Sequence, residues 1–193
     1  MSDLYPIKRA LISVSDKTEI SKLGKVLSTC GVEIISTGGS AEVLRAYDIP
    51  VKDVSELTEF PEMMNGRVKT LHPKVHGGLL ALRNEQNHIS AMRRHQISEI
   101  DLLVVNLYPF QETIKDGCSF EEAIEKIDIG GPTMIRAAAK NFQDVVVVSD
   151  PNDYQELIDE WDDGNGISYE SRKRLSQKVF SIMADYNKSI SLY

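Results

Sequence analysis

Residues 9–40 read RALISVSDKTEISKLGKVLSTCGVEIISTGGS and contain one arrangement twice. In each copy, a short apolar run of the kind that is buried in parallel sheets ends in hydroxyl-bearing residues and is followed by a helical pattern. We expect the first strand at residues 9–14 and the second at residues 32–36. Two successive strand–loop–helix units predict an α/β fold with a mainly parallel sheet.

The rest of the chain continues this alternation. Further strands are expected at residues 50–54, 101–106 and 144–149. Helices are expected after residue 16 and at residues 41–47, 84–95, 120–127, 132–140, 151–161 and 169–189, with a turn or one-turn helix at 55–62 and loops at 66–78 and 162–166. At 193 residues, the chain is expected to form a single domain.

Three of the expected helix starts carry recognisable signals. Asp16 and Glu19 have the spacing of a capping box, and so do Ser119 and Glu122. Pro132 follows two glycines and is expected at the first helical position, where no hydrogen bond from its nitrogen is needed.

The composition restricts the classes of function. The chain has 29 Asp and Glu against 22 Lys and Arg, which argues against general nucleic-acid binding by charge. Cys30 and Cys118 form no CxxC pair, so reduced thiols are expected. No stretch has the length and hydropathy of a membrane span or the apolar core of an export signal, and we expect a cytoplasmic protein.

Residues 66–78, GRVKTLHPKVHGG, gather cations and a hydroxyl between glycines in a chain whose formal net charge is −7. Arg67, Lys69 and Thr70 can supply charge and directed hydrogen bonds to an anionic ligand. A solvated basic loop is the alternative.

His72 and His76 have the H-x-x-x-H spacing that can bind zinc on a helix. Pro73 between them and the lack of the glutamate of an HExxH motif argue against zinc binding. We therefore expect no metal site, and a structural role for both histidines in the loop, with His72 bordering the substrate as an open alternative.

Polar groups follow the expected strands or begin the expected helices at five places. These are Ser13 and Ser15 with Lys17, the segment Thr37-Gly38-Gly39-Ser40, the segment 67–70, Asn106 with Tyr108, and the segment Asp128-Ile129-Gly130. The carboxyl ends of parallel strands share one edge of a sheet, where ligands bind in open α/β folds. A glycine pair before a helix can offer N–H groups to a phosphate, although a tight turn is the alternative. The pattern predicts a pocket with a phosphate end and a reactive end that holds Tyr108, Asp128 and at least one lysine.

Six motifs in this order carry a family resemblance: SVSDK at 13–17, STGGS at 36–40, VSELTEFPEM at 54–63, GRVKTLHPKVHGG at 66–78, NLYPF at 106–110 and IDIGGPTMIRAAAKN at 127–141. The chain resembles the IMP cyclohydrolase domain, the N-terminal half of the bifunctional AICAR transformylase/IMP cyclohydrolase. The resemblance implies a methylglyoxal-synthase-like, three-layer α/β/α sandwich over residues 1–193. A helix at 168–193 would lead to a transformylase domain that this chain lacks.

The resemblance also implies an activity. It is the closure of 5-formamidoimidazole-4-carboxamide ribotide (FAICAR) to IMP with loss of water, the last step of purine ring building, without a metal or organic cofactor. The implied partners are this ribonucleotide, a transformylase domain in the same chain and a second copy in a homodimer, with no nucleic acid or membrane. A methylglyoxal synthase or a nucleotide-binding regulatory module of the same fold is the alternative, but neither is expected to combine GRVKTLHP with NLYPF and IDIGG.

By motif position, the resemblance assigns residues to the two ends of the pocket. The substrate-binding residues are Ser13, Ser15, Lys17, Thr37, Gly38, Gly39, Ser40, Arg67, Thr70, Asn106, Ile129 and Gly130. The catalytic residues are Lys69, Tyr108, Asp128 and Lys140.

The chemistry suggests a role for each catalytic residue. We expect Asp128 to orient the carboxamide or accept its proton, Lys69 or Lys140 to polarise the formyl oxygen, and Tyr108 to assist proton transfer or orientation. For Asp128, the alternative is an acid that only complements the dipole of the following helix. The division of roles between the two lysines is left open. Lys140 lies about 12 Å along a helix from Pro132, so a direct pair of Asp128 with Lys140 is left open as well.

Overall fold

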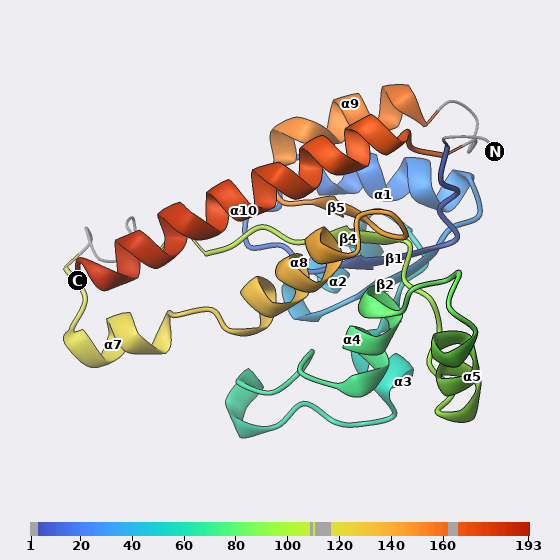
Figure 1. Cartoon of the computed structure of the whole chain (residues 1–193). Helices are drawn as coiled ribbons and strands as arrows, with labels where there is room; N and C mark the ends of the chain where they lie inside the picture. Colours follow the sequence, from blue (N-terminus) through green and yellow to red (C-terminus); the bar gives the residue numbers. More distant parts are fainter. Residues whose placement is uncertain (1–3, 109, 111–116, 162–165) are drawn as a thin grey trace.

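The computed structural model describes residues 4–108, 110, 117–161 and 166–193. Within these ranges, five strands form one parallel sheet in the order β3-β2-β1-β4-β5 (Figure 1). The strands are β1 (Arg9–Ile12), β2 (Glu33–Ser36), β3 (Lys52–Asp53), β4 (Leu102–Val104) and β5 (Val146–Val148). The predicted parallel α/β sheet is confirmed. Pro109 of the NLYPF motif and residues 162–165 of an expected loop lie outside the described residues.

Helices cover both faces of the sheet (Figure 1). They are α1 (Ile20–Thr29), α2 (Gly38–Ala46), α3 (Val54–Thr58), α4 (Pro73–Leu80), α5 (Gln86–Arg94), α7 (Phe120–Glu125), α8 (Gly130–Lys140), α9 (Tyr154–Glu160) and α10 (Tyr169–Ser191), with short 3-10 turns η1 (Met64–Gly66) and η2 (Pro151–Asp153). Helices α1 and α9 pack on one face, α4 and α8 pack on the other, and α10 packs against β5 and α8. The three layers are those expected.

Alternate residues of β1, β2, β4 and β5 enter different hydrophobic cores. Ile12 lies in the core beneath α1 and α9, whereas the preceding Leu11 lies in the core beneath α4 and α8. Successive side chains of a strand point to opposite faces, so one short apolar run supplies both cores. Leu103 of β4 is fully buried in the second core, and burial of a side chain of this size contributes about 1.5–3 kcal/mol.

The register of the strands aligns their carboxyl ends. Ile12 pairs with Ser36 on one side and with Val104 on the other. The residues that follow these strands therefore emerge at the same edge of the sheet, where open α/β folds bind their ligands.

Two helix starts differ from the prediction. Helix α1 has no capping box, because Glu19 precedes it at φ 57° without a side-chain cap and Asp16 instead accepts hydrogen bonds from the N–H (2.9 Å) and hydroxyl (2.6 Å) of Thr18. A short acid that bonds two residues ahead forms its own turn and competes with the helix. Helix α8 begins at Gly130, so Pro132 lies inside its first turn. The predicted capping box at the start of α7 is present.

The second half of the expected basic loop is a helix. Helix α4 begins at Pro73, and His72 caps it by accepting a hydrogen bond from the Lys74 N–H at Nδ1 (3.1 Å). Proline suits the first helical position because its φ is already helical. A Cβ on Gly78 would lie 2.5 Å from the Ser98 carbonyl oxygen, so glycine lets α4 pack closely against the segment that leads into β4.

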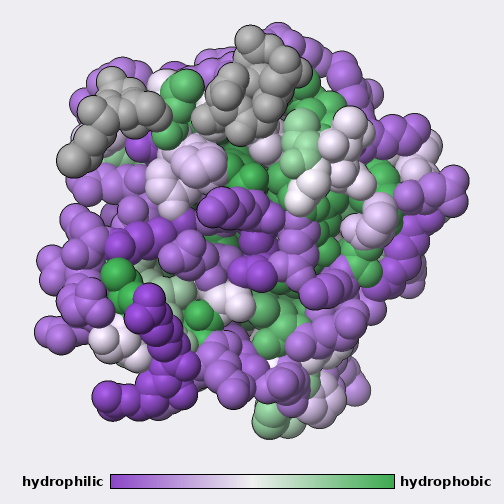
Figure 2. All heavy atoms as spheres, turned by 90° about the vertical axis from the view of Figure 1, so that its right-hand side faces the viewer, coloured by the Kyte–Doolittle hydropathy of each residue, from purple (hydrophilic) through white to green (hydrophobic). Residues whose placement is uncertain are grey.

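The face of the molecule that lies on the right-hand side of Figure 1 is mainly hydrophilic, with hydrophobic residues reaching the surface between the polar ones (Figure 2). In the ranges that the structure describes, no helix combines the length and the apolar character that crossing a bilayer requires.

Replacing Leu103 by alanine should lower the free energy of unfolding by about 2–5 kcal/mol, because it leaves a cavity in the core beneath α4 and α8. Leu82→Ala is the matched control, since that side chain is 40% exposed and its loss should change stability by about 0.5 kcal/mol or less. Denaturant unfolding of both variants checks this. Equal losses would contradict the assignment of β4 to the interior.

Candidate functional site

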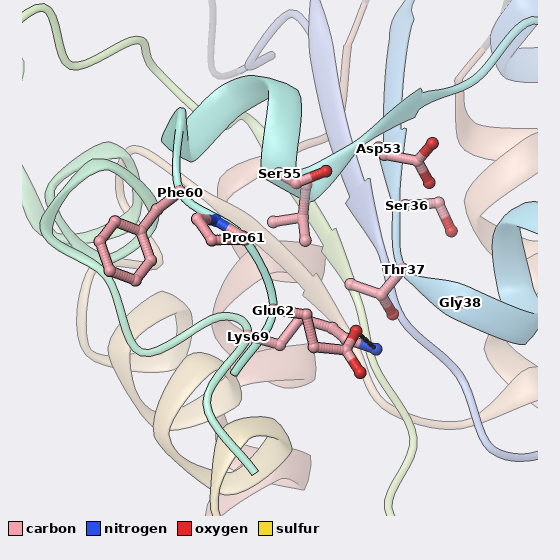
Figure 3. Close-up of a pocket in the computed structure, with 10 residues that line it drawn as sticks. Ser36, Thr37, Gly38, Asp53, Ser55, Phe60, Pro61, Glu62 and Lys69 are labelled. Atoms are coloured by element: carbon pink, nitrogen blue, oxygen red, sulfur yellow. Dashed lines mark ion pairs between the residues drawn. The ribbon is translucent and has the colours of Figure 1, made fainter. Parts of the chain in front are cut away.

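A cavity of about 270 Å³ opens at the carboxyl edge of the sheet, beside the ends of β2 and β3 (Figure 3). Ligand pockets usually measure about 300–1,000 Å³, so this one is slightly small. Its lining residues are Ser36, Thr37, Gly38, Asp53, Val54, Ser55, Phe60, Pro61, Glu62 and Lys69. Thr37, Gly38 and Lys69 are the lining residues that the sequence predicted.

The start of α2 forms one wall of the cavity. The helix begins at Gly38, three residues before the expected start, and Thr37 is its N-cap. The Thr37 hydroxyl lies 2.7 Å from the Ser13 hydroxyl, which connects the ends of β1 and β2. The buried Ser40 hydroxyl accepts a hydrogen bond from the Val14 N–H (2.9 Å) and donates one to the Val14 carbonyl (3.1 Å). The Ser40 side chain, a predicted ligand contact, is thus engaged in holding the loop after β1 against α2.

Two lysines converge on the glycines at this helix start. A Cβ on Gly38 would lie 3.6 Å from Lys69 Nζ, and a Cβ on Gly39 would lie 3.7 Å from Lys17 Nζ. The first N–H groups of a helix lack partners within it and carry partial positive charge. Two ammonium groups beside such N–H groups form a strong binding position for an anion.

Asn106 holds the loop after β1 in place. Its Oδ1 accepts hydrogen bonds from the N–H groups of Ser15 (2.7 Å) and Asp16 (2.9 Å), and its Nδ2 donates to the Asp16 carbonyl (2.8 Å). Asn106 is also buried. Its polar atoms are therefore used inside the protein, which gives it a positioning role, and its predicted contact with the substrate stays a prediction.

Asp128 lies at the start of α8. Its Oδ1 accepts a hydrogen bond from the Gly131 N–H (2.9 Å), and its own N–H donates to the Tyr186 hydroxyl (2.7 Å). Burial raises the pKa of the Asp128 carboxyl above its ordinary value, although hydrogen bonds from the N–H groups of Gly131 and Gly130 act in the opposite direction. The neighbouring Ile129 is exposed. The site therefore contains a carboxyl group that holds its proton more tightly than an ordinary aspartate does.

Thr70 connects the two parts of the site. A Cβ on Gly130 would lie 2.9 Å from Thr70 Oγ1, so the start of α8 lies directly against the residue that follows Lys69. The anion position and Asp128 thus flank the same short segment of chain.

Apart from Thr37, Gly38 and Lys69, the predicted residues, Asp128 included, are not among those that line the cavity. Three of their side chains lie in other surroundings. Arg67 forms a two-point ion pair with Glu125 of α7, at 2.6 Å and 3.1 Å, on the protein surface. Tyr108 is 51% exposed and does not line the cavity. Lys140 is the exposed last residue of α8, ten residues beyond Gly130, which is about 15 Å along a helix. The close pairing of Lys140 with Asp128, which was left open, is not formed.

The opposite wall was missed as a source of site residues. Asp53, Ser55, Phe60, Pro61 and Glu62 line the cavity, and Glu62 forms an ion pair with Lys69 at 2.5 Å (Figure 3). The signal was the VSELTEFPEM motif, which contributed to the family resemblance but received no site assignment. Acidic residues repel an anionic ligand, so a motif with three glutamates did not indicate an anion pocket.

Metal ligation finds no support in the geometry. In the described part of the chain, no three His, Cys, Asp or Glu side chains gather as a metal ion would require. His72 is occupied as the N-cap of α4. Burial lowers the pKa of the His76 imidazole, which favours its neutral form.

Asn106→Ala should speed amide hydrogen exchange at Ser15 and Asp16, because both N–H groups lose their acceptor. We expect about tenfold faster exchange, in line with about 1–1.5 kcal/mol for a hydrogen bond. The control is Asn152→Ala, whose exposed side chain bonds to Asp150. Unchanged exchange at Ser15 and Asp16 would show that Asn106 does not hold this loop.

Asp128→Asn should change the pH dependence of stability. Because the folded pKa is raised, the folded wild type holds this proton more tightly, and it loses stability as the pH rises through the folded pKa. Asparagine keeps an oxygen for the Gly131 N–H but has no proton to lose. The variant should therefore gain stability relative to the wild type at about pH 7 but not at about pH 3.

Denaturant unfolding at both pH values measures this difference. Asp185→Asn, which removes an exposed charge on α10, is the control for the loss of one carboxylate. A gain for Asp128→Asn that is the same at both pH values would contradict the link to ionisation.

Known proteins are similar to this chain in both sequence and fold. Residues 19–133 match the family "MGS-like domain", and residues 138–193 match the family "AICARFT/IMPCHase bienzyme". The chain is 57% identical to the "Bifunctional purine biosynthesis protein PurH" of Ruegeria sp. (strain TM1040), over 99% of this chain and 36% of that protein. It is 54% identical to the protein of the same name from Clostridium acetobutylicum, over 97% of this chain and 38% of that protein.

A solved structure shows the same architecture. The crystal structure of ForH superposes with a TM-score of 0.83 at 34% identity, covering 96% of this chain and 97% of that one. The chain spans little more than a third of the length of the curated relatives it matches. It belongs to the family of MGS-like domains, in the form carried by the bifunctional purine biosynthesis proteins named PurH.

Proposed function

We propose that this chain is an IMP cyclohydrolase, which closes FAICAR to IMP with loss of water. The observation that carries the proposal is the convergence of Lys17 and Lys69 on the glycines at the start of α2. Asp128 lies nearby at the start of α8, and Thr70 lies against the same helix start. The match to the AICARFT/IMPCHase family and to proteins named PurH supports it.

The phosphate of the ribotide would bind at the start of α2. The N–H groups of Gly38 and Gly39 and the ammonium of Lys17 would surround it, and the hydroxyls of Ser13 and Thr37 would complete the set of donors. Because the loop after β1 is fixed by Asn106, these donors are in place before the ligand arrives, which lowers the entropic cost of binding.

Ring closure is an intramolecular addition followed by dehydration. The carboxamide nitrogen attacks the formyl carbon, a C–N bond forms, and the carbonyl electron pair moves to the formyl oxygen. That oxygen gains one proton and the attacking nitrogen loses one, which leaves a hydroxyl on the new ring carbon. In the dehydration, the C–O bond breaks, the hydroxyl takes a second proton and leaves as water, and the former formamide nitrogen loses its proton as a C=N bond forms. Since the two groups belong to one molecule, the protein contributes mainly orientation, charge stabilisation and proton transfer.

Lys69 would stabilise the developing charge on the formyl oxygen, a contribution of about 3–4 kcal/mol for one good donor. Asp128 would accept the amide proton. Its raised pKa makes it a stronger base than an ordinary aspartate.

Tyr108 and Lys140 have less support. Lys140 lies at the far end of α8 from Asp128, and the Tyr108 side chain is 51% exposed, so no step is assigned to them and their catalytic roles stay predictions. If the Lys140→Ala variant closes FAICAR at the wild-type rate, the predicted catalytic role of Lys140 is wrong.

The remaining parts of the proposal concern the setting of the domain. The curated relatives are much longer than this chain. We propose that a transformylase domain accompanies the cyclohydrolase in the whole protein, that the protein acts in the cytoplasm, and that two copies associate.

Lys69→Met should lower kcat for the closure of FAICAR by about 100- to 1,000-fold, because it removes one donor to the developing oxyanion. Binding of IMP should weaken as well, because Lys69 also lies beside the anion position at Gly38, but by a smaller factor. An absorbance assay of IMP formation and calorimetric titration with IMP separate the two effects, with exposed Lys173→Met of α10 as the control. A well-folded wild type that binds nucleotide tightly but forms no IMP would overturn the enzymatic proposal and support a regulatory module.

A further inference from the structure

The cavity contains an acid where an anion is expected. Glu62 pairs with Lys69 across the short hairpin that the Met63–Val68 bridge closes, and Figure 3 shows the pair beside Thr37 and Gly38. We propose that Glu62 is an internal competitor for the anionic ligand: its carboxylate neutralises Lys69 in the empty site and must leave when the ligand binds. This inference rests on the proposed binding of a ribotide at the same site.

The position of Lys69 makes the competition direct. Its Nζ lies 2.5 Å from Glu62 Oε2 and would lie 3.6 Å from a Cβ on Gly38. One ammonium group thus serves both the acid and the helix start at which the ligand anion would bind. A phosphate arriving there meets the carboxylate at short range, and like charges in a partly enclosed cavity repel strongly.

The segment that carries Glu62 is shaped around this carboxylate. Met63 and Val68 form an antiparallel bridge with bonds of 3.0 Å and 3.3 Å, and the turn between them includes Asn65 at φ 54° and Gly66 at φ 91°. Non-glycine residues seldom adopt positive φ. A Cβ on Gly66 would lie 2.8 Å from Glu62 Oε1, so glycine leaves the room that the carboxylate occupies.

The size of the cavity agrees with a Glu62 carboxylate that takes up part of the space for a ligand. Its volume of about 270 Å³ lies just below the usual range for ligand pockets. Glu62 is among its lining residues, and rotation of this side chain away from Lys69 would enlarge the space beside Gly38. The Glu62 carboxylate thus reduces both the positive charge and the volume that the cavity offers to an incoming anion.

A neighbouring ion pair supplies a matched control. Glu59 lies three residues earlier and pairs with Lys74 of α4, and it does not line this cavity. Glu59→Gln and Glu62→Gln change the net charge equally and each removes one lysine–glutamate pair. Only the second removes the proposed competitor.

The test is calorimetric titration of the wild type and both variants with ribose 5-phosphate. At low salt, Glu62→Gln should bind about fivefold more tightly than the wild type, and the difference should shrink at about 0.5 M salt, where the Debye length falls to a few ångströms. Glu59→Gln should bind like the wild type. Thermal unfolding of each variant verifies that it is folded.

A second comparison tests the route through Lys69. In a Lys69→Met background, Glu62→Gln should improve binding much less than in the wild type, because the acid is no longer held beside the anion position. An equal gain in both backgrounds would show a general effect of removing charge and would overturn the proposal.

The remaining outcomes separate the two proposals. If the wild type binds ribose 5-phosphate and Glu62→Gln binds it equally or more weakly, only the proposed role of Glu62 is overturned. Absence of binding in the wild type and in both variants overturns the anion site itself, and the proposed function with it.

Discussion

The parallel pairing of β1 with both of its neighbours is the constraint on which the rest of the molecule depends. Its register places Ile12 level with Ser36 and Val104, so the loops that follow three strands leave the sheet at the same height. This alignment brings the hydroxyls of Ser13 and Thr37 within 2.7 Å of each other. A shift of one residue would turn every side chain of the strand to the opposite face, and the two cores would prevent it.

Much of this arrangement was predictable because it is encoded locally. Short apolar runs, turn residues and helix starts lie within a few positions of one another, and parallel strands share an edge by geometry alone. The anion position at Gly38 and Gly39 follows from that logic. The missed α1 start has a local cause too: Asp16 had two uses, and the turn with Thr18 prevailed over the capping box.

The rest could not be predicted because it depends on partners distant in sequence. Arg67 was expected in the pocket, but it pairs with Glu125, fifty-eight residues away. Asn106 was expected to touch the ligand, but its polar atoms bond to the loop ninety residues earlier. The position of Glu62 follows from a turn that no residue spacing announces. For each of these residues the type of side chain was informative, whereas its direction was decided by tertiary structure.

The basic segment that suggested an anion site is largely neutralised in the folded chain. Lys74 pairs with Glu59 and Arg67 pairs with an acid of α7, so these cations stabilise the packing of their segment. Lys69 differs because its acid partner lies inside the cavity. A cation that only stabilised the fold would not need to face the start of a helix, where the dipole already favours negative charge. The placement of Lys69 is therefore best explained by a second anion, with Glu62 in its place until that anion binds.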